Sequence, residues 1–251
     1  AAQRFRYVHD TYLRNNGIKT YLSVIPDKNT FIASQNGYPD KDYEALVKRL
    51  RSGFSQAEYI DISALLSADD FYYTDSHWRQ EKILTVADKI ADKMGAERIG
   101  HCEKHDAGVS FYGVYYGQAA LPHAPERLFY LDNAVIRGLK VYNAEESSDI
   151  PVYDLAAAAG RDPYEMFLGG VRSIIRITNP NAAKERRLIV FRDSFGSSIA
   201  PLLAAGYSEI TLVDIRYITP SALGRMIDFA KADDALFLYS ASVINNSETI
   251  K

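Results

Sequence analysis

The chain has 251 residues, of which 47% are hydrophobic and 24% are charged, and its formal net charge at pH 7 is −3. This is the composition of a globular protein long enough to bury a full core. Because no basic field or basic tail is present, nucleic acid is not expected among the partners. The single cysteine, Cys102, excludes an intramolecular disulfide.

The sequence does not determine the cellular compartment of the protein. No apolar run approaches the roughly 20 residues that a helix needs to cross a bilayer. The chain nevertheless starts abruptly with Ala1-Ala2-Gln3-Arg4, already in helix-like sequence. A protein that had lost an N-terminal signal or membrane anchor would begin in this way, so the missing signal peptide excludes neither the cytoplasm nor export.

The first hundred residues predict helices that alternate with short strands. Apolar spacing and turn residues predict helices over 1–16, over 40–52 and from the "TDSHW" motif at 74–78 to Gly95, with strands over 18–26 and 57–63. In the third helix, Ile83, Val86 and Ile90 share one face. The two residues Asp75 and His77 are therefore expected at a helix start.

The region 100–180 has a different character, with many glycines and prolines and short aromatic strands between turns. We interpret it as an insertion of β-hairpins and loops within a single domain that spans 1–251. From 185 onward the pattern becomes regular. The apolar runs "LIVF", "EITLVDI" and "ALFLYS" alternate with helices, which predicts an open α/β sheet covered on both faces.

In such a sheet, functional groups gather at the carboxyl ends of the strands. After "LIVF" comes Arg192-Asp193-Ser194-Phe195-Gly196, followed by an apolar helix. This pattern places Ser194 on a tight turn at a helix N-terminus, where backbone N–H groups favour a developing negative charge. Ser194 is therefore a candidate nucleophile, and the alternative is that Asp193 or Ser194 is only an N-cap.

A serine nucleophile needs a base, and the base needs an acceptor that orients it. His77 and Asp75 are suited to those two roles, with Trp78 packed beside the imidazole. The alternative is again capping, with Thr74 or Asp75 at the cap position. Each capping interpretation is plausible alone, but the two motifs together supply a complete Ser/His/Asp set.

The strings "YYTDSHW", "LIVFRDSFGSSIAPLL" and "ITLVDIRYI" resemble the bacterial DHHW family, which belongs with the SGNH hydrolase-like proteins that include the alginate O-acetylation proteins. The resemblance covers most of the chain. It implies a three-layer, flavodoxin-like α/β sheet with circularly permuted motif order, in which Asp75 orients, His77 is the general base and Ser194 is the nucleophile.

The resemblance also implies a function. We expect a serine-dependent ester hydrolase or O-acetyltransferase that acts on a cell-envelope or extracellular glycan, needs no cofactor, and lies outside the cytoplasm behind a lost anchor or signal. Peptide or lipid esters are not separated from glycan esters by sequence. The alternative is a non-catalytic glycan-binding or envelope-assembly protein that keeps a vestigial SGNH core.

The sequence departs from the family pattern at several points. Ser76 stands between Asp75 and His77, Arg192 replaces a glycine, and no Gly-x-Asn-Asp block is present. The oxyanion donors beyond the Ser194 amide are therefore open. The further candidates for substrate or oxyanion binding are Arg192, Phe195, Arg216 and Tyr217. For Arg216, a structural ion pair with Asp214 or another acid is an equal alternative.

Two other patterns are weaker evidence for a functional site. His101, Cys102 and His105 form H-C-x-x-H, but a zinc site needs four ligands, or three and water, and no second cluster is evident, so no metal is expected. Tyrosines cluster at 72–73 and at 112, 115 and 116. They suit a carbohydrate or peptide surface, and the alternative is that they are half-buried strand residues.

Overall fold

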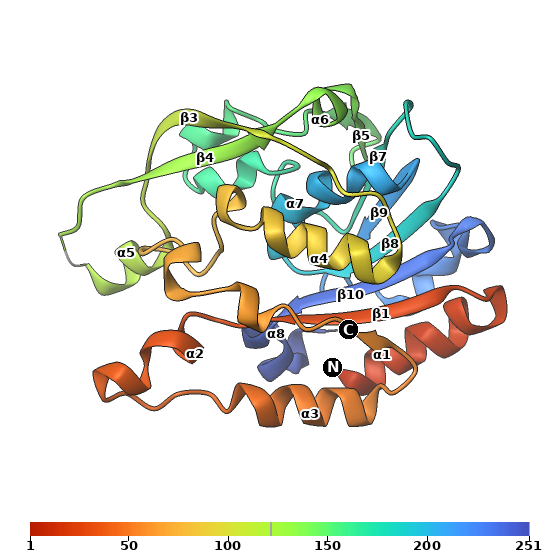
Figure 1. Ribbon diagram of the computed structural model, residues 1–251, viewed down its shortest axis with the longest axis horizontal. Coiled ribbons are helices and arrows are strands. Elements are labelled where there is room, and N and C mark those ends of the chain that lie inside the picture. Colours follow the sequence, from red (N-terminus) through yellow and green to blue (C-terminus); the bar gives the residue numbers. More distant parts are fainter. Residues whose placement is uncertain (121, 251) are drawn as a thin grey trace.

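A computed structural model of the protein describes residues 1–120 and 122–250 (Figure 1). An eight-stranded sheet runs through it in the order β2-β1-β10-β8-β9-β7-β5-β6. Its strands are β1 (Lys19–Ile25), β2 (Glu58–Tyr59), β5 (Lys140–Asn143), β6 (Ser148–Ile150), β7 (Ile174–Thr178), β8 (Arg187–Arg192), β9 (Glu209–Val213) and β10 (Asp234–Ser240).

The parallel part of this sheet positions the functional residues. Strands β2, β1, β10, β8 and β9 pair in parallel, whereas β7, β5 and β6 continue the sheet in antiparallel fashion. All seven residues of β10 are buried, as expected for a strand with helices on both faces. The parallel strands predicted from the apolar runs after 185 are confirmed, and their carboxyl ends meet at one edge.

Helices cover both faces of the sheet, which gives three layers (Figure 1). On one face α1, α3 and α8 pack against β8 and β10, and on the other face α4 and α7 do so. This confirms the predicted α/β class. The helices are α1 (Ala2–Val8), α2 (Asn29–Ile32), α3 (Tyr43–Gly53), α4 (Leu84–Met94), α5 (Val114–Ala119), α6 (Ala134–Gly138), α7 (Phe195–Ile199) and α8 (Ala241–Asn245).

The region 100–180 takes two places in the fold. Strands β3 (Glu103–Phe111) and β4 (Glu126–Asp132) form a separate antiparallel hairpin, with α5 in the connection between them. The later strands β5, β6 and β7 join the central sheet. A small apolar cluster that includes Tyr72, Phe111 and Phe167 lies under the hairpin.

Two predictions about local structure are wrong. The helix expected between β9 and β10 is replaced by two short 3₁₀ helices, Pro220–Arg225 and Phe229–Lys231. The "TDSHW" motif does not begin a helix, because α4 starts only at Leu84. The motif lies on a loop that Phe71 and Trp78 close with an isolated antiparallel bridge. The Asp75 side chain bonds to the His77 amide two residues later, which stabilises a turn instead of a helix N-terminus.

None of the helices in residues 1–120 and 122–250 combines the length and the apolar character that crossing a bilayer requires.

Candidate active site

Ser194 lies two residues after the end of β8, on a turn that Asp193 shapes. The Asp193 carboxylate accepts a hydrogen bond from the Phe195 amide at 3.1 Å and another from the Ser240 amide of β10 at 2.8 Å. Asp193 therefore ties two neighbouring strand ends together and takes the local turn-forming role. The Ser194 side chain makes no capping hydrogen bond, so its hydroxyl is available for another contact.

Gly196 permits the turn to fold back tightly onto β8. A Cβ atom at this position would lie 2.6 Å from Cβ and 2.8 Å from Cγ of Arg192, both inside van der Waals contact. The glycine in Ser-Phe-Gly is therefore required by the close approach of Arg192. The helix can start immediately after Ser194 only because the third residue lacks a side chain.

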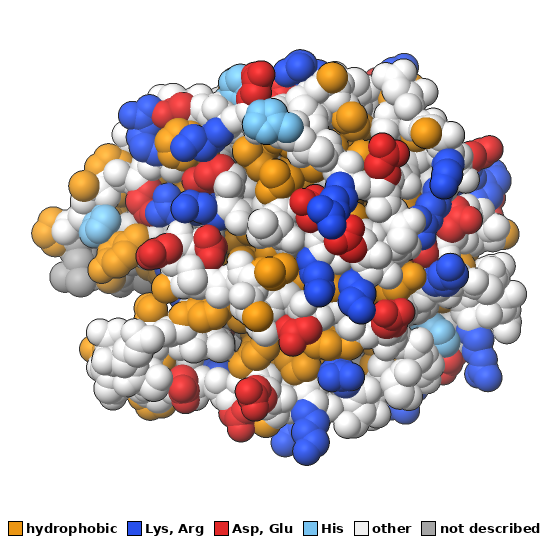
Figure 2. Space-filling view, viewed as in Figure 1, with side chains coloured by type: hydrophobic (Ala, Val, Ile, Leu, Met, Phe, Trp, Pro, Cys, Tyr) orange, Lys and Arg blue, Asp and Glu red, His pale blue; other side chains and the backbone are white. Residues whose placement is uncertain are grey.

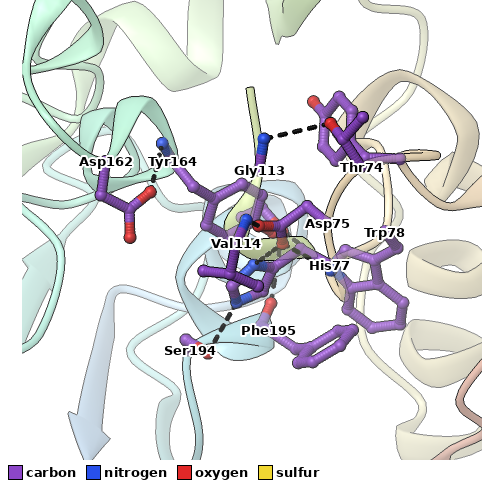
Figure 3. A network of polar contacts seen from close by, with 12 residues as sticks. Thr74, Asp75, His77, Trp78, Gly113, Val114, Asp162, Tyr164, Ser194 and Phe195 are labelled. Carbon is purple, nitrogen blue, oxygen red and sulfur yellow. Dashed lines mark hydrogen bonds and ion pairs between the residues drawn. The ribbon is translucent and has the colours of Figure 1, made fainter. Parts of the chain in front are cut away.

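Ser194, His77 and Asp75 form one hydrogen-bonded chain (Figure 3). Nε2 of His77 lies 2.7 Å from Oγ of Ser194, and Nδ1 lies 2.6 Å from Oδ1 of Asp75. Because a carboxylate only accepts, we assign the imidazole proton to Nδ1, which leaves Nε2 to accept from the serine hydroxyl. Residues 117 positions apart in sequence are therefore in direct contact.

Asp75 is buried and ionised. Burial alone would raise the pKa of its carboxyl, but hydrogen bonds from the His77 ring, the His77 amide and the Val114 amide outweigh burial and hold that pKa below its ordinary value. The amide of Val114 donates to Oδ2 at 2.9 Å. A carboxylate in this state orients the imidazole and would stabilise an imidazolium.

The loop that carries Asp75 and His77 is held by Glu126 of β4. The Glu126 carboxylate is mostly buried. Its Oε1 accepts a hydrogen bond from the Tyr73 amide at 2.8 Å, and its Oε2 accepts from the Thr74 amide and the Thr74 hydroxyl, both at 2.7 Å. Arg79 forms an ion pair with the same carboxylate. Glu126 therefore fixes the two residues that immediately precede Asp75.

Aromatic rings enclose the His77 imidazole. Tyr164 stacks on it with 3.9 Å between ring centroids and 12° between planes, and Phe195 packs at 4.8 Å. The Tyr164 hydroxyl and the Trp78 indole N–H both donate to Oγ of Ser198 at 2.8 Å. Burial raises the pKa of Tyr164 well above its ordinary value, so this hydroxyl stays a donor. The rings limit the directions in which His77 can move.

The two arginines that the sequence offered as anion binders take different positions. Arg192 is 1% exposed, with its guanidinium 3.3 Å from the Asp193 carbonyl and 3.8 Å from Asp214. Arg216 pairs with both oxygens of Asp214, at 2.9 and 2.7 Å. The ion pair that remained open for Arg216 is therefore observed. Tyr217 is half exposed beside the Arg216 guanidinium.

Within the part of the chain that the structure describes, no group of three or more His, Cys, Asp or Glu side chains is placed to hold a metal ion. In the H-C-x-x-H string, His105 lies 3.6 Å from Glu103 and stacks on Tyr130. Cys102 is buried, and burial raises the pKa of its thiol.

Sequence reasoning missed three residues around the site, namely Glu126, Gly113 and Tyr164. Gly113 donates its amide to the Thr74 hydroxyl at 3.0 Å and lies against Asp75. All three belong to the region 100–180, and they hold the site through backbone atoms or ring faces. No spacing in the sequence links such contacts to the "TDSHW" motif. The contacts of Tyr164 and Gly113 with the site can be recognised only from the three-dimensional position of the loop.

The fold and the order of its motifs define a three-layer α/β protein of the SGNH hydrolase-like class, with the histidine loop preceding the serine strand. Residues 60–213 match the DHHW protein family, and the chain belongs to that family. The resemblance inferred from "YYTDSHW" and the later motifs is thereby confirmed. No curated protein sequence matches the chain at a significant level.

Solved structures share this fold at low sequence identity. A DHHW family protein from Eubacterium siraeum is 18% identical, with a TM-score of 0.75 over 99% of this chain and 87% of that chain. Bacillus cereus PatB1 with a sulfonyl adduct is 18% identical, with a TM-score of 0.73 over 96% and 89%. The O-acetyltransferase domain of Pseudomonas putida AlgJ is 13% identical, with a TM-score of 0.57 over 97% and 81%. At these identities the similarity establishes the fold.

Proposed function

We propose that the protein is a serine-dependent acyl-ester hydrolase or O-acetyltransferase that acts on a cell-envelope or extracellular glycan outside the cytoplasm. The observation that carries this proposal is the chain of contacts from Asp75 through His77 to Ser194, at 2.6 and 2.7 Å. A nucleophile, a base and an orienting carboxylate at these distances meet the geometric requirement for nucleophilic acyl transfer.

In the first half-reaction, Oγ of Ser194 attacks the carbonyl carbon of the ester while Nε2 of His77 takes the hydroxyl proton. The carbonyl electron pair moves to oxygen, and the Ser194 amide at the start of α7 is the candidate donor to that oxyanion. The intermediate then expels the alcohol oxygen, which His77 protonates. The product is an acyl group on Ser194 and a free hydroxyl on the leaving sugar.

In the second half-reaction, His77 removes a proton from an incoming hydroxyl, which attacks the acyl-Ser194 carbonyl. Water as acceptor completes ester hydrolysis, and a sugar hydroxyl completes transfer of the acetyl group. In both cases the proton returns through His77 to Ser194. The same residues serve either outcome, so the acceptor that reaches the acyl-enzyme decides between the two.

A groove that touches Tyr73 and Thr74 of the loop carrying His77 suits a glycan as ligand, although Ser194 and His77 are not among its lining residues. It has a volume of about 1020 Å³ and opens between α2 and α5, where Figure 2 shows hydrophobic side chains along a hollow. Tyr38 and Tyr73 line it and are each 70% exposed, and Tyr115 and Tyr116 reach it from α5 instead of from a strand. Exposed aromatic faces with polar tips suit sugar rings. The AlgJ domain of similar fold is an O-acetyltransferase.

The second candidate, a non-catalytic glycan-binding protein, would also use this groove. A Ser194 blocked by Arg192 or Tyr217 would favour it. The polar contacts of Arg192 are instead with Asp193 and Asp214, and Tyr217 lies beside Arg216. Ser194 keeps partial exposure and its contact with His77, and this arrangement supports the catalytic candidate.

The proposal is tested by p-nitrophenol release from p-nitrophenyl acetate, with and without oligosaccharide acceptors. The Ser194→Ala variant is compared with Ser197→Ala, which removes a buried hydroxyl three residues further along the chain, in α7. We expect turnover by the intact protein and by Ser197→Ala, and none above background by Ser194→Ala. Acetylated sugar among the products would identify transfer. Equal inactivity of the intact protein and Ser194→Ala would favour the glycan-binding candidate.

A further inference from the structure

The segment 72–74, which leads into Asp75, is held by two side chains of opposite charge. Glu126 accepts from the amides of Tyr73 and Thr74. On the carbonyl side, Nζ of Lys28 donates to the Tyr72 carbonyl at 2.5 Å and to the Tyr73 carbonyl at 3.1 Å. A carboxylate thus binds the amides and an ammonium binds the carbonyls of one short stretch of backbone.

Lys28 also connects this segment to two other parts of the molecule. It belongs to the loop that follows β1, at the carboxyl edge of the sheet, and its side chain is half-buried there, at the border of the groove between α2 and α5. Its Nζ lies 4.8 Å from the centroid of the Tyr115 ring on α5. The Tyr115 amide in turn donates to the Thr74 carbonyl at 2.9 Å. Three segments that are distant in sequence therefore meet around one ammonium group.

We propose that Lys28 is a positioning residue whose ammonium holds residues 72–74 in the conformation that aims Asp75 at His77, so that loss of its proton lowers catalysis reversibly at alkaline pH. This inference rests on the proposed acyl-transfer function. Among the described residues Lys28 makes no hydrogen bond to His77 or Ser194, and it acts through the backbone that carries Asp75.

The surroundings of Lys28 place its titration close to physiological pH. Burial is the largest influence and lowers the pKa of Lys28 to about 8, while the carboxylates of Asp75 and Glu126 oppose burial and the guanidinium of Arg79 adds to it. On its own loop, Asp27 is engaged by Lys41 and by the Ser242 hydroxyl. A neutral amine donates more weakly than an ammonium, because hydrogen bonds from a charged donor are about twice as strong.

The inference is tested by measuring kcat and KM for p-nitrophenyl acetate between pH 6 and pH 10, after subtraction of the Ser194→Ala background. Lys28→Met removes the ammonium, Lys28→Arg keeps a charge throughout this range, and Lys48→Met removes an exposed ammonium from α3. In the intact protein and in Lys48→Met we expect kcat to fall above pH 8.

In Lys28→Met we expect kcat to be lower at pH 7, by roughly 10- to 100-fold for a misplaced catalytic group, without the fall above pH 8. In Lys28→Arg the fall should move beyond pH 10. KM for this small ester should be unchanged in both variants. A residue with only a structural role would change folding but would not move the pH profile. The inference is overturned if Lys28→Met keeps the alkaline fall or if the intact protein has none.

A second measurement separates this inference from the proposed function. The proton between His77 Nδ1 and Asp75 should give a strongly downfield proton NMR signal. We expect this signal to weaken reversibly above pH 8 in the intact protein and in Lys48→Met, and to persist to higher pH in Lys28→Arg. This result in a protein without esterase activity would sustain the positioning role while the catalytic proposal failed. A signal indifferent to pH 8 in the intact protein would refute the positioning role.

Discussion

Gly113 and Asp75 are packed so closely that no side chain fits between them. A Cβ atom on Gly113 would lie 2.3 Å from Cβ of Asp75 and 2.4 Å from the Thr74 carbonyl oxygen. Figure 3 shows Gly113 beside the loop that carries Asp75 and His77. The start of α5 is therefore in direct steric contact with the residue that orients the histidine.

We expect Gly113→Ala to displace Asp75 and to lower kcat by roughly 100-fold, the effect of about a 1 Å displacement of a catalytic group. Overpacking should also destabilise the protein by about 1–3 kcal/mol. Gly117→Ala in the same helix is the matched control, because nothing lies within 4 Å of its added Cβ. Esterase assays and urea unfolding check both variants, and a fully active Gly113→Ala would contradict the expectation.

We expect Asp75→Asn to lower kcat on the order of 10⁴-fold, because the amide would favour the wrong imidazole tautomer. The exposed Asp149→Asn is the control. The pKa of Asp75 is lower in the folded protein than its ordinary value of 3.8. Its carboxylate therefore contributes stability that is fully present above the unfolded pKa and is lost as pH falls through the folded pKa. The stability difference between the intact protein and Asp75→Asn should accordingly be constant at neutral pH and shrink below about pH 4.

The contributions of the Tyr164 ring and of its hydroxyl can be measured separately by substitution. Tyr164→Phe keeps the ring on His77 and loses only the hydrogen bond to Ser198, so we expect a loss of about 0.5–1.5 kcal/mol in unfolding free energy and little change in kcat. Tyr164→Ala removes the ring and leaves a cavity, with an expected loss of about 3–5 kcal/mol and a clear fall in kcat. Urea unfolding and ester hydrolysis measure both, and equal kcat in the two variants would show that stacking does not hold His77.

Lys28 should influence stability in the direction opposite to its influence on activity. Its pKa is about 8 in the folded protein against 10.5 for an ordinary lysine, so the unfolded chain binds the proton more tightly. Deprotonation therefore favours folding, and this group makes stability rise between about pH 8 and pH 10.5. The unfolding free energy of the intact protein relative to Lys28→Met should increase across that range. A difference that stays flat would show that the folded-state pKa of Lys28 is ordinary.

Much of the fold, and the residues that meet in the candidate site, could be predicted from sequence. The apolar runs after 185 are parallel strands because only a strand covered on both faces is apolar at every position. Ser194 follows from this, since it stands at the carboxyl end of β8. The Asp75 and His77 pair came from motif order and chemistry, and the structure places it against Ser194.

The rest could not be predicted, for reasons that are physical. Asp75 followed by an amphipathic pattern looks like a helix cap, but its carboxylate bonds to the His77 amide and ring and stabilises a turn. Glu126 binds two backbone amides, and because almost every residue has one, the sequence does not show which amides a carboxylate will bind. The choice for Arg216 between an anion and Asp214 depended on side-chain geometry that only the structure supplies.

The separate hairpin of β3 and β4 has a consequence for how the chain becomes active. Ser194 needs only the central sheet for its placement, whereas Asp75 and His77 depend on Gly113 and Glu126, which come from the hairpin and its connection. A molecule in which 103–132 opened locally would keep a folded sheet and a serine without its base. Changes confined to this one segment would therefore be enough to separate Asp75 and His77 from Ser194 over evolutionary time, with the sheet left intact.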